Sequence, residues 1–445
     1  MTMVDEEKID EHAAAEHIHG ICLKTGPPRR VGVELEWLVR DARNPGMPVP
    51  ANRIAAAVAQ FDTVAEFDTV DGFAAVPGLP TSAQPGALPS GATLTTEPGG
   101  QLEISSQPAD SLTDLVDATL ADLATLRSAA DAAGLELAGF GLDPIRPPRR
   151  LLTLPRYAAM EAFFDRGGPW GRRMMCGTAS VQVCLDAGDE SDGAAGYRRR
   201  WRLVHAIGPV LVAAFANSPL RAGRPTGWRS SRQQVWSHMD PGRTRPPSTD
   251  RDPRAAWTRY ALDAQVMCIR TDGSDDWSAP PGLTFRDWVR GGAMDAGRLR
   301  RPTAGDLDYH LSTLFPPVRP HGHLELRMID AQPRDGWIAP LAVTSALLDD
   351  SRASDAAVAA ADRLWAGHGP GDDDLWLRAA QLGPADPAIA QASRECFEAA
   401  RDALSRQSAS AGIQSAVDAF IERYVSRDRC PADDLLSPAE PQEAR

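Results

Sequence analysis

The strongest constraint on the fold is a segment in which apolar and polar residues alternate. In residues 31–40 (VGVELEWLVR), apolar side chains such as Leu35 and Trp37 occupy every second position, with Glu34 and Glu36 between them. Successive side chains of a β-strand point to opposite faces of the sheet. The segment therefore predicts a strand with one apolar face and one acidic face.

The same alternation recurs in three later segments. Their polar positions are Glu103 in residues 101–105, Gln182 in residues 179–186, and Glu325 and Arg327 in residues 323–330. If these strands lie in one curved, antiparallel sheet, helices cover its apolar face, and the other face is concave and rich in negative charge. For each strand alone an alternative stays open, because the solvated outer faces of sheets also carry glutamate and arginine.

Helical patterns separate and follow these strands, which predicts an α+β fold. Asp110 is a candidate N-cap for a helix that closes at Gly134. Residues 201–216 are predicted to be mostly helical, with a kink at Pro209. From about residue 337 the chain is alanine-rich and helical.

The length bounds the domain organisation. The chain has 445 residues, which fits either three domains or one large domain with insertions. We predict one large domain over residues 1–430 with loop insertions near 74–92 and 240–256, the second being a candidate substrate lid. Residues 431–445 are predicted to form a loose tail.

The charge balance argues against several classes of partner. The chain has 47 basic and 60 acidic residues and a net charge of −13, whereas nucleic acids and anionic membranes select clustered cations. We therefore expect no nucleic-acid or membrane partner. Its lysines, Lys8 and Lys24, lie outside any Gly-x-x-x-x-Gly-Lys pattern, which excludes a P-loop nucleotide site.

Cysteine usage and apolar runs indicate the compartment. The six cysteines are dispersed and form no Cys-x-x-Cys pair, so neither a zinc ribbon nor a disulfide framework is expected. The first residues are acidic, unlike a secretory signal. The most apolar stretch, residues 203–216, is shorter than the about 20 residues of a membrane span. We predict a soluble, cytoplasmic protein.

Glutamates gathered on one face need a counter-charge. At ~4 Å and an effective dielectric constant of about 20, each like-charged pair costs about 4 kcal/mol. Such a cluster persists with divalent cations or with raised pKa values. Oxygen donors suit Mg²⁺ or Mn²⁺ better than Zn²⁺. The polar face is therefore a candidate site for several Mg²⁺ ions, which could bind a nucleoside triphosphate without a P-loop.

Five motifs at these same residues resemble the plant-like type of the glutamate–cysteine ligase family. They are GVELEW (32–37), TEPGGQLEIS (96–105), MMCGTASVQVCLD (174–186), FANSPLRAGRPTGWRSSRQQVW (215–236) and FPPVRPHGHLELRMIDAQP (315–333). They follow the family's order across about two-thirds of the chain. The resemblance is greatest to the branch that supplies γ-glutamylcysteine for ergothioneine biosynthesis.

The resemblance implies a single catalytic domain with a glutamine-synthetase-like fold, whose curved sheet forms the active site. It also implies that Arg327 contacts the transferred phosphoryl group and that several glutamates bind Mg²⁺. The implied metal ligands are Glu34, Glu36, Glu97, Glu103 and Glu325. Gln182 occupies a position where some related ligases have a histidine ligand, although a neutral amide binds Mg²⁺ more weakly.

By the same resemblance, Arg232 binds the α-carboxylate of a glutamate substrate. Arg229 and Trp236, at i−3 and i+4 on the same predicted helix, are candidate substrate-binding neighbours. The alternatives are a surface position for Arg232 and core packing for Trp236.

The implied reaction joins the γ-carboxylate of L-glutamate to the amine of L-cysteine, with ATP as co-substrate and a γ-glutamyl phosphate intermediate. Two alternatives stay open: a different amine acceptor, and a non-catalytic protein that binds glutamate or nucleotide. We predict that Glu36→Ala or Glu325→Ala abolishes turnover with little loss of stability, because each change removes a crowded anion.

Overall fold

The computed structural model describes residues 8–61, 63–64, 87–249, 252–271, 273–291, 299–368 and 374–437. Its centre is an eight-stranded sheet in the order β2–β3–β4–β1–β6–β10–β9, with β5 paired to β1. The strands of this sheet are β1 (Val31–Asp41), β2 (Thr63–Val64), β3 (Thr93–Thr96), β4 (Leu102–Ser105), β5 (Leu135–Ala138), β6 (Ser180–Leu185), β9 (Val318–Pro320) and β10 (Leu324–Asp330). A separate small hairpin consists of β7 (Leu220–Arg221) and β8 (Arg224–Pro225).

The pairing confirms a mainly antiparallel sheet. Strand β1 pairs antiparallel with β4, β5 and β6, and β10 pairs antiparallel with β6 and β9. The short pair β2–β3 is parallel. The four strands predicted from alternation are all present, within one or two residues of the predicted bounds.

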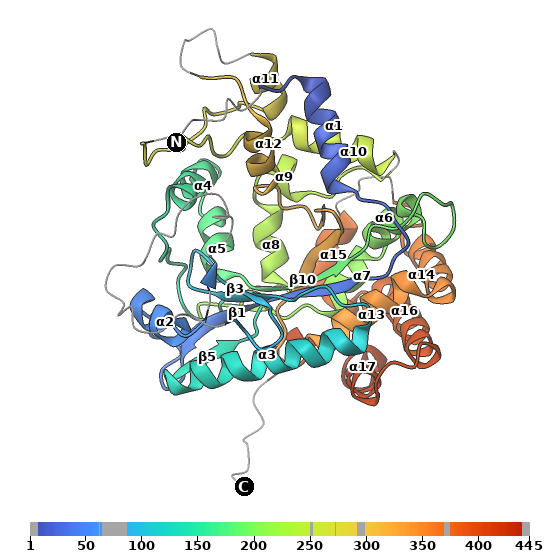
Figure 1. The fold of residues 1–445 in the computed structure, drawn as a ribbon. Helices are drawn as coiled ribbons and strands as arrows, with labels where there is room; N and C mark the ends of the chain where they lie inside the picture. The colour runs from blue at the N-terminus through green and yellow to red at the C-terminus, as the bar shows by residue number, and fades with distance from the viewer. Residues whose placement is uncertain are drawn as a thin grey trace.

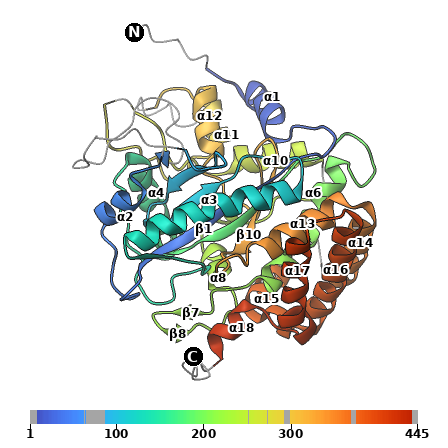
Figure 2. The ribbon, with the colours of Figure 1, turned by 60° about the horizontal axis from the view of Figure 1, so that its bottom comes forward.

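The apolar face of the sheet packs against helices and forms the main hydrophobic core. Val33, Leu35 and Trp37 of β1 are at most 3% exposed and share this core with the covering helices. Figures 1 and 2 show the long helix α3 and helix α13 on this side. The elements that contribute are α2 (Ala51–Val58), α3 (Leu112–Ala132), α6 (Tyr197–Ala206), α7 (Gly208–Ala214), α13 (Ile338–Asp349), α14 (Ser351–Leu364), α15 (Asp374–Leu382), α16 (Pro387–Arg406), α17 (Ala411–Arg423) and the 3₁₀ turn Val425–Arg427.

A second group of helices lies on the other side of the sheet (Figure 1). These are α1 (Glu11–Cys22), α4 (Pro155–Asp165), α5 (Trp170–Gly177), α8 (Ser231–Ser237), α9 (Pro241–Thr244), α10 (Pro253–Asp263), α11 (Phe285–Arg290) and α12 (Ala304–Leu311). They have apolar clusters of their own: one joins α4, α5 and α8, and another joins α1, α10, α11 and α12. The sequence predicted helices over the apolar face only. These separate clusters explain how helices also stand over the polar face.

Two helix predictions need correction. The N-cap of α3 is Ser111 rather than Asp110, because the Ser111 hydroxyl accepts the N–H of Asp114 at 3.1 Å. The expected kink at Pro209 is instead a break at Ile207. Pro209 lies in the first turn of α7, where a backbone N–H would have no partner within the helix, so the missing N–H of proline costs nothing.

The predicted insertions and tail contain more order than expected. Residues 240–256 include α9 and the start of α10, so the prediction of a long loop there was wrong. The loose tail was also wrong for its first part: α18 (Pro431–Leu436) is a helix, and Ala432 is fully buried. Of the insertion at 74–92, residues 87–92 are described and lack regular structure; the rest lies outside the described residues.

None of the helices in the described ranges is both long and apolar enough to span a lipid bilayer.

Candidate active site

Neighbouring strands bring acidic residues that are far apart in the chain onto one face of the sheet. Glu36 of β1 lies opposite Glu103 of β4, and Glu34 lies opposite Gln182 of β6. Two strands from β1, Glu325 lies on β10. Alternation predicted this shared face, and the register of the sheet provides it.

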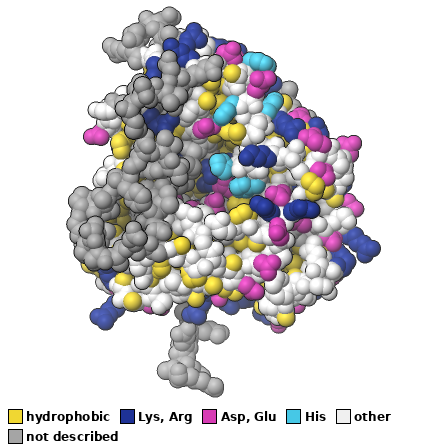
Figure 3. All heavy atoms as spheres, viewed as in Figure 1, with side chains coloured by type: hydrophobic (Ala, Val, Ile, Leu, Met, Phe, Trp, Pro, Cys, Tyr) yellow, Lys and Arg dark blue, Asp and Glu magenta, His cyan; other side chains and the backbone are white. Residues whose placement is uncertain are grey.

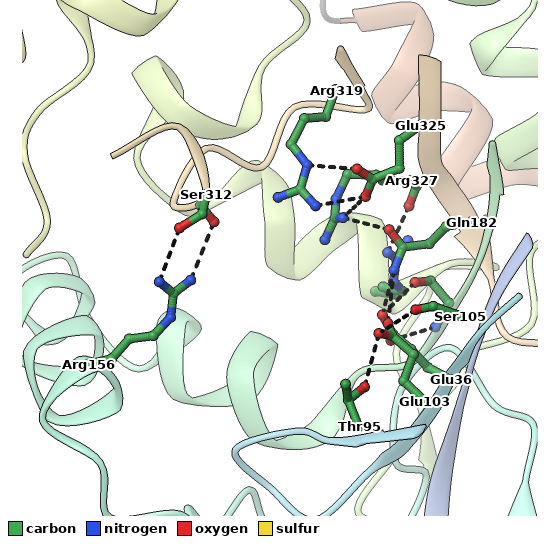
Figure 4. A network of polar contacts seen from close by, with 12 residues as sticks. Glu36, Thr95, Glu103, Ser105, Arg156, Gln182, Ser312, Arg319, Glu325 and Arg327 are labelled. Carbon is green, nitrogen blue, oxygen red and sulfur yellow. Dashed lines mark hydrogen bonds and ion pairs between the residues drawn. The ribbon is translucent and has the colours of Figure 1, made fainter. Parts of the chain in front are cut away.

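The carboxamide of Gln182 joins two of these acids to Arg327 (Figure 4). Its Nε2 donates to Glu36 Oε1 at 2.9 Å and to Glu103 Oε2 at 3.3 Å. Its Oε1 accepts from Arg327 Nη1 at 2.5 Å. A shared donor thus lies between the two carboxylates and offsets their repulsion. This geometry gives Gln182 a bridging role, and its role as a metal ligand stays a prediction.

Small hydroxyl side chains also hold the two carboxylates. Ser180 donates its backbone N–H to Glu36 Oε2 at 2.9 Å and its hydroxyl to Glu36 Oε1 at 3.0 Å. Thr95 donates its hydroxyl to Glu103 Oε1 at 3.1 Å. Neither Ser180 nor Thr95 was among the predicted site residues, although each occupies a polar position of a strand next to a glutamate.

Glu325 is 1% exposed and lies between two arginines (Figure 4). Arg319 donates from Nε and Nη2 to the two Glu325 oxygens, at 2.7 and 3.0 Å. Arg327 also forms an ion pair with Glu325. Burial acts to raise the pKa of Glu325, but the two guanidinium groups outweigh it, so that pKa is lowered. The β9–β10 hairpin across His321–His323 could have revealed Arg319, because it places residue 319 opposite residue 325.

A bulge in β10 positions Arg327. The register with β6 shifts between Leu326 and Ile329, and the Arg327 N–H donates to the Pro317 carbonyl at 2.8 Å. Burial acts to lower the pKa of Arg327, whereas Glu325, Glu34 and Glu36 raise it, and the net direction is upward. Arg327 therefore stays cationic. Bulges are common next to active sites because they redirect a side chain.

Glu97 belongs to a tight turn at the edge of this face. The turn is closed by hydrogen bonds from Glu97 N to the Gln101 carbonyl and from Gly100 N to the Glu97 carbonyl, both 2.8 Å. A Cβ at Gly99 would lie 2.4 Å from the Cys176 carbonyl oxygen, and Gly100 has φ +85°. Glycine is thus required at position 99 by the approach to α5 and at position 100 by the backbone conformation.

Arg232 is buried beside Arg327. Its Nη2 donates to the Arg327 carbonyl at 2.8 Å, while its Nε and Nη1 are buried with no hydrogen-bond partner among the described residues. Burial lowers the pKa of Arg232, opposed by Asp330 and Glu36. The surface alternative for Arg232 is therefore wrong. Buried guanidinium donors that lack partners are suited to an anionic ligand.

The two predicted neighbours of Arg232 differ. Trp236 stacks against it, with the Arg232 Cζ 5.5 Å from the ring centroid. Arg229 precedes α8, whose N-cap is Ser230, and its Nε pairs with Asp433 of α18 at 2.8 Å. The prediction that Arg229 shares a helical face with Arg232 was wrong, because the helix begins too late to include it.

Open space adjoins these residues. A small pocket is lined by Arg232, Gln233, Trp236, Thr244, Phe315, Pro316, Pro317, Arg327 and Met328. In Figure 4, Arg156 of α4 and Ser312 lie across an open space from the Glu325 network. Figure 3 shows acidic, basic and histidine side chains around a hollow on this face of the molecule. The site thus has a cationic side at Arg327 and an acidic side at Glu36 and Glu103.

The donor set fits a hard divalent cation. Within the described ranges, no three acidic, histidine or cysteine side chains are grouped as a ready metal site. The oxygens of Glu36 and Glu103 nevertheless lie within hydrogen-bond distance of the same Gln182 nitrogen, and carboxylate oxygens are the ligands that Mg²⁺ prefers. Glu325 is held by arginines, so its role as a metal ligand stays a prediction.

Comparison with known proteins identifies the family. Residues 30–445 match the model of glutamate–cysteine ligase family 2 (GCS2). The chain belongs to this family. Relatives named glutamate–cysteine ligase EgtA are 38% identical: that of Mycobacterium tuberculosis (strain H37Rv) over 97% of this chain and 91% of its own, and that of Mycolicibacterium smegmatis over 95% and 90%.

Plant members of the GCS2 family are also similar. The chloroplastic glutamate–cysteine ligase of Medicago truncatula is 32% identical over 54% of this chain and 47% of its own. The sequence had indicated both the plant-like family and its ergothioneine-related branch, and these matches confirm that family assignment.

Proposed function

We propose that this protein is an ATP- and Mg²⁺-dependent ligase that joins the γ-carboxylate of L-glutamate to the amine of L-cysteine. The observation that carries the proposal is the placement of Arg327, bonded to Gln182 and Glu325, beside the paired carboxylates Glu36 and Glu103. Phosphoryl transfer between two anions needs charge neutralisation, which a cationic side chain can supply directly and acidic oxygens can supply by binding metal ions. Membership of the GCS2 family supports the same reaction.

In the first step, a γ-carboxylate oxygen of glutamate bonds to the γ-phosphorus of ATP, and the bond from that phosphorus to the bridging oxygen of ADP breaks. Arg327 donates hydrogen bonds to the transferred phosphoryl group through its planar fork. Glu325 and Gln182 hold that guanidinium in place. The products are γ-glutamyl phosphate and ADP.

Arg232 binds the α-carboxylate of glutamate through a donor without a partner among the described residues, and its Nε and Nη1 are both such donors. The Trp236 ring stacks on the face of this guanidinium and restricts its orientation. Because Arg232 also bonds the Arg327 carbonyl, the two arginines have a fixed spacing, which sets the distance between the two ends of the substrate.

Glu36 and Glu103, with Glu34 and Glu97 nearby in the sheet and its edge turn, would hold Mg²⁺, or Mn²⁺ in its place. When bound, the ions neutralise the charge of the triphosphate. In the second step, the cysteine amine attacks the acyl carbon, phosphate leaves, and the amine loses a proton to solvent.

The acceptor and the pathway are finer parts of the proposal. The names of the relatives, glutamate–cysteine ligase EgtA, support cysteine as the acceptor. Ergothioneine biosynthesis as the pathway rests on the motif resemblance alone. A different amine acceptor is the alternative. A cytoplasmic location stays a prediction from the sequence.

The test incubates the purified protein with L-glutamate, MgATP and a panel of amines that includes L-cysteine. We expect γ-glutamylcysteine, ADP and phosphate in equal amounts, and loss of turnover with EDTA. Glutamate labelled with ¹⁸O in its γ-carboxylate should transfer one label to phosphate. Arg327→Gln should abolish ADP release, whereas Arg202→Gln, on exposed α6 surface, should not. A preferred acceptor other than cysteine, or no ADP release with any acceptor, would contradict the proposal.

A further inference from the structure

Asp330, at the end of β10, is 2% exposed and has no place in the reaction above. We propose that Asp330 is a positioning residue: through the hydroxyls of Ser218 and Ser230 it fixes the first turn of α8, and thereby the Arg232 guanidinium that binds glutamate. This inference rests on the proposed function for Arg232.

Three donors converge on the Asp330 carboxylate. Its Oδ2 accepts the Asn217 N–H at 2.9 Å and the Ser218 hydroxyl at 2.7 Å. Its Oδ1 accepts the Ser230 hydroxyl at 2.9 Å. A buried carboxylate with this many donors is fixed in direction, since each oxygen is held from a different chain segment.

Both hydroxyls relay this constraint to α8. The Ser218 Oγ accepts the Arg232 N–H at 3.1 Å, and the Ser230 Oγ accepts the Gln233 N–H at 3.2 Å. A hydroxyl has one proton and accepts through its lone pairs. Because each proton is given to Asp330, the lone pairs stay turned toward the helix N–H groups, which are otherwise unsatisfied at a helix start.

The same helix turn is attached to β10 at a second place. The Arg232 Nη2 bonds the Arg327 carbonyl, and the Gln233 Nε2 bonds the Met328 carbonyl, both at 2.8 Å. Asp330 also packs closely against Gly141, because a Cβ at that glycine would lie 2.3 Å from the Asp330 Cγ. The backbone N–H of Arg232 is therefore held by Asp330 through the Ser218 hydroxyl, and its guanidinium is held by the Arg327 carbonyl.

Charge supports this geometry. Burial raises the pKa of Asp330, and Arg232 is the strongest opposing influence. For Arg232, burial lowers the pKa and Asp330 is the strongest influence that raises it. Each group is thus the main electrostatic partner of the other in the buried region, although the serines make the direct bonds.

The test compares Ser218→Ala and Asp330→Asn with Ser393→Ala. Ser393 is a matched control, because it is equally buried at 2% exposed and its hydroxyl donates to the Ile389 carbonyl within α16, away from Asp330 and α8. We expect Ser218→Ala to raise the KM for glutamate about three- to ten-fold, as for loss of one hydrogen bond. Asp330→Asn should raise it by more than about ten-fold, since two relays change. The KM for ATP should stay within about two-fold in both variants.

A purely structural role would lower kcat and thermal stability together in all three variants and leave the glutamate KM unchanged, and that result would overturn the inference. Glutamate binding by calorimetry gives a second readout that needs no turnover, and it should weaken in Ser218→Ala but not in Ser393→Ala. Failure of the proposed function is a separate result, seen as absence of ligation by the unmutated protein.

Discussion

Arg319 and Glu325 face each other across the β9–β10 hairpin and share hydrogen bonds of 2.7 and 3.0 Å. Arg327 pairs with the same carboxylate. The acidic face therefore contains its own counter-charges, in addition to any cation that binds there. This relationship changes the expected cost of mutating the face, because removing one member leaves buried charges of the opposite sign.

Replacing Arg319 by Gln should destabilise the protein by about 3–5 kcal/mol, the usual cost of breaking a buried ion pair from one side. It should also lower kcat by about ten-fold or more, because Glu325 would then pull Arg327 out of position. Urea unfolding and steady-state kinetics measure the two effects. As a control, Arg200→Gln breaks the pair with Asp349 on the apolar side and should lower stability only. Unchanged kinetics of Arg319→Gln would contradict the coupling.

Glu36→Ala and Glu325→Ala should both abolish turnover but differ in stability. Glu36 is bonded by the neutral groups of Ser180 and Gln182, so its removal should cost about 1–2 kcal/mol. Removal of Glu325 leaves Arg319 and Arg327 together without their shared anion and should cost about 3–5 kcal/mol. The structure thus revises the sequence-based expectation of little loss for Glu325. Equal unfolding midpoints for the two variants would argue against this difference.

Gly99→Ala should destabilise the protein by about 1–3 kcal/mol, because its Cβ would meet the Cys176 backbone and the turn would have to move. Glu97 would move with that turn, so the Mg²⁺ concentration needed for half-maximal rate should rise. Gly412→Ala is the matched control, since that helical position has nothing within 4 Å of the added Cβ and should be neutral or stabilising by up to about 1 kcal/mol. Thermal unfolding and a Mg²⁺ titration of the rate distinguish the two.

Stability should fall as the pH drops from about 6.5 toward 4, because of buried histidine. Burial lowers the pKa of His205 from 6.5 to about 4. The unfolded chain then takes up a proton that the folded chain refuses, at about 1.4 kcal/mol per pH unit in this window. In this pH window, His205→Leu should reduce the slope of the unfolding free energy against pH by the amount that corresponds to one bound proton. His310, whose pKa burial lowers to about 3, should maintain part of the slope in His205→Leu.

The sequence predicted the strands and their shared face well because a period of two is a local property. Glu36, Glu103 and Gln182 could each be assigned to a face from their nearest neighbours, and a single sheet then brings them together. The apolar face was predictable for the same reason, since Leu35 and Trp37 lie in the core as the alternation requires.

Contacts between distant segments could not be predicted in this way. Arg229 looked like a helix neighbour of Arg232, but Asp433 holds it elsewhere. Asp330 ends an alternating strand and has no local sign of its role, because its partners come from residues 217–230. The helices over the polar face also depend on tertiary packing, since their apolar clusters form only between elements far apart in sequence.

The helix α18 holds both ends of the segment 216–229, which leads into α8. Asp433 anchors Arg229, and the Ala432 N–H bonds the Ala216 carbonyl at 2.9 Å. Those two contacts flank the segment that leads into α8. A shortened variant that stops before Pro431 would lose both contacts, so the segment that leads to Arg232 would become more mobile. Protein engineering of this enzyme should therefore preserve the chain through Ser437.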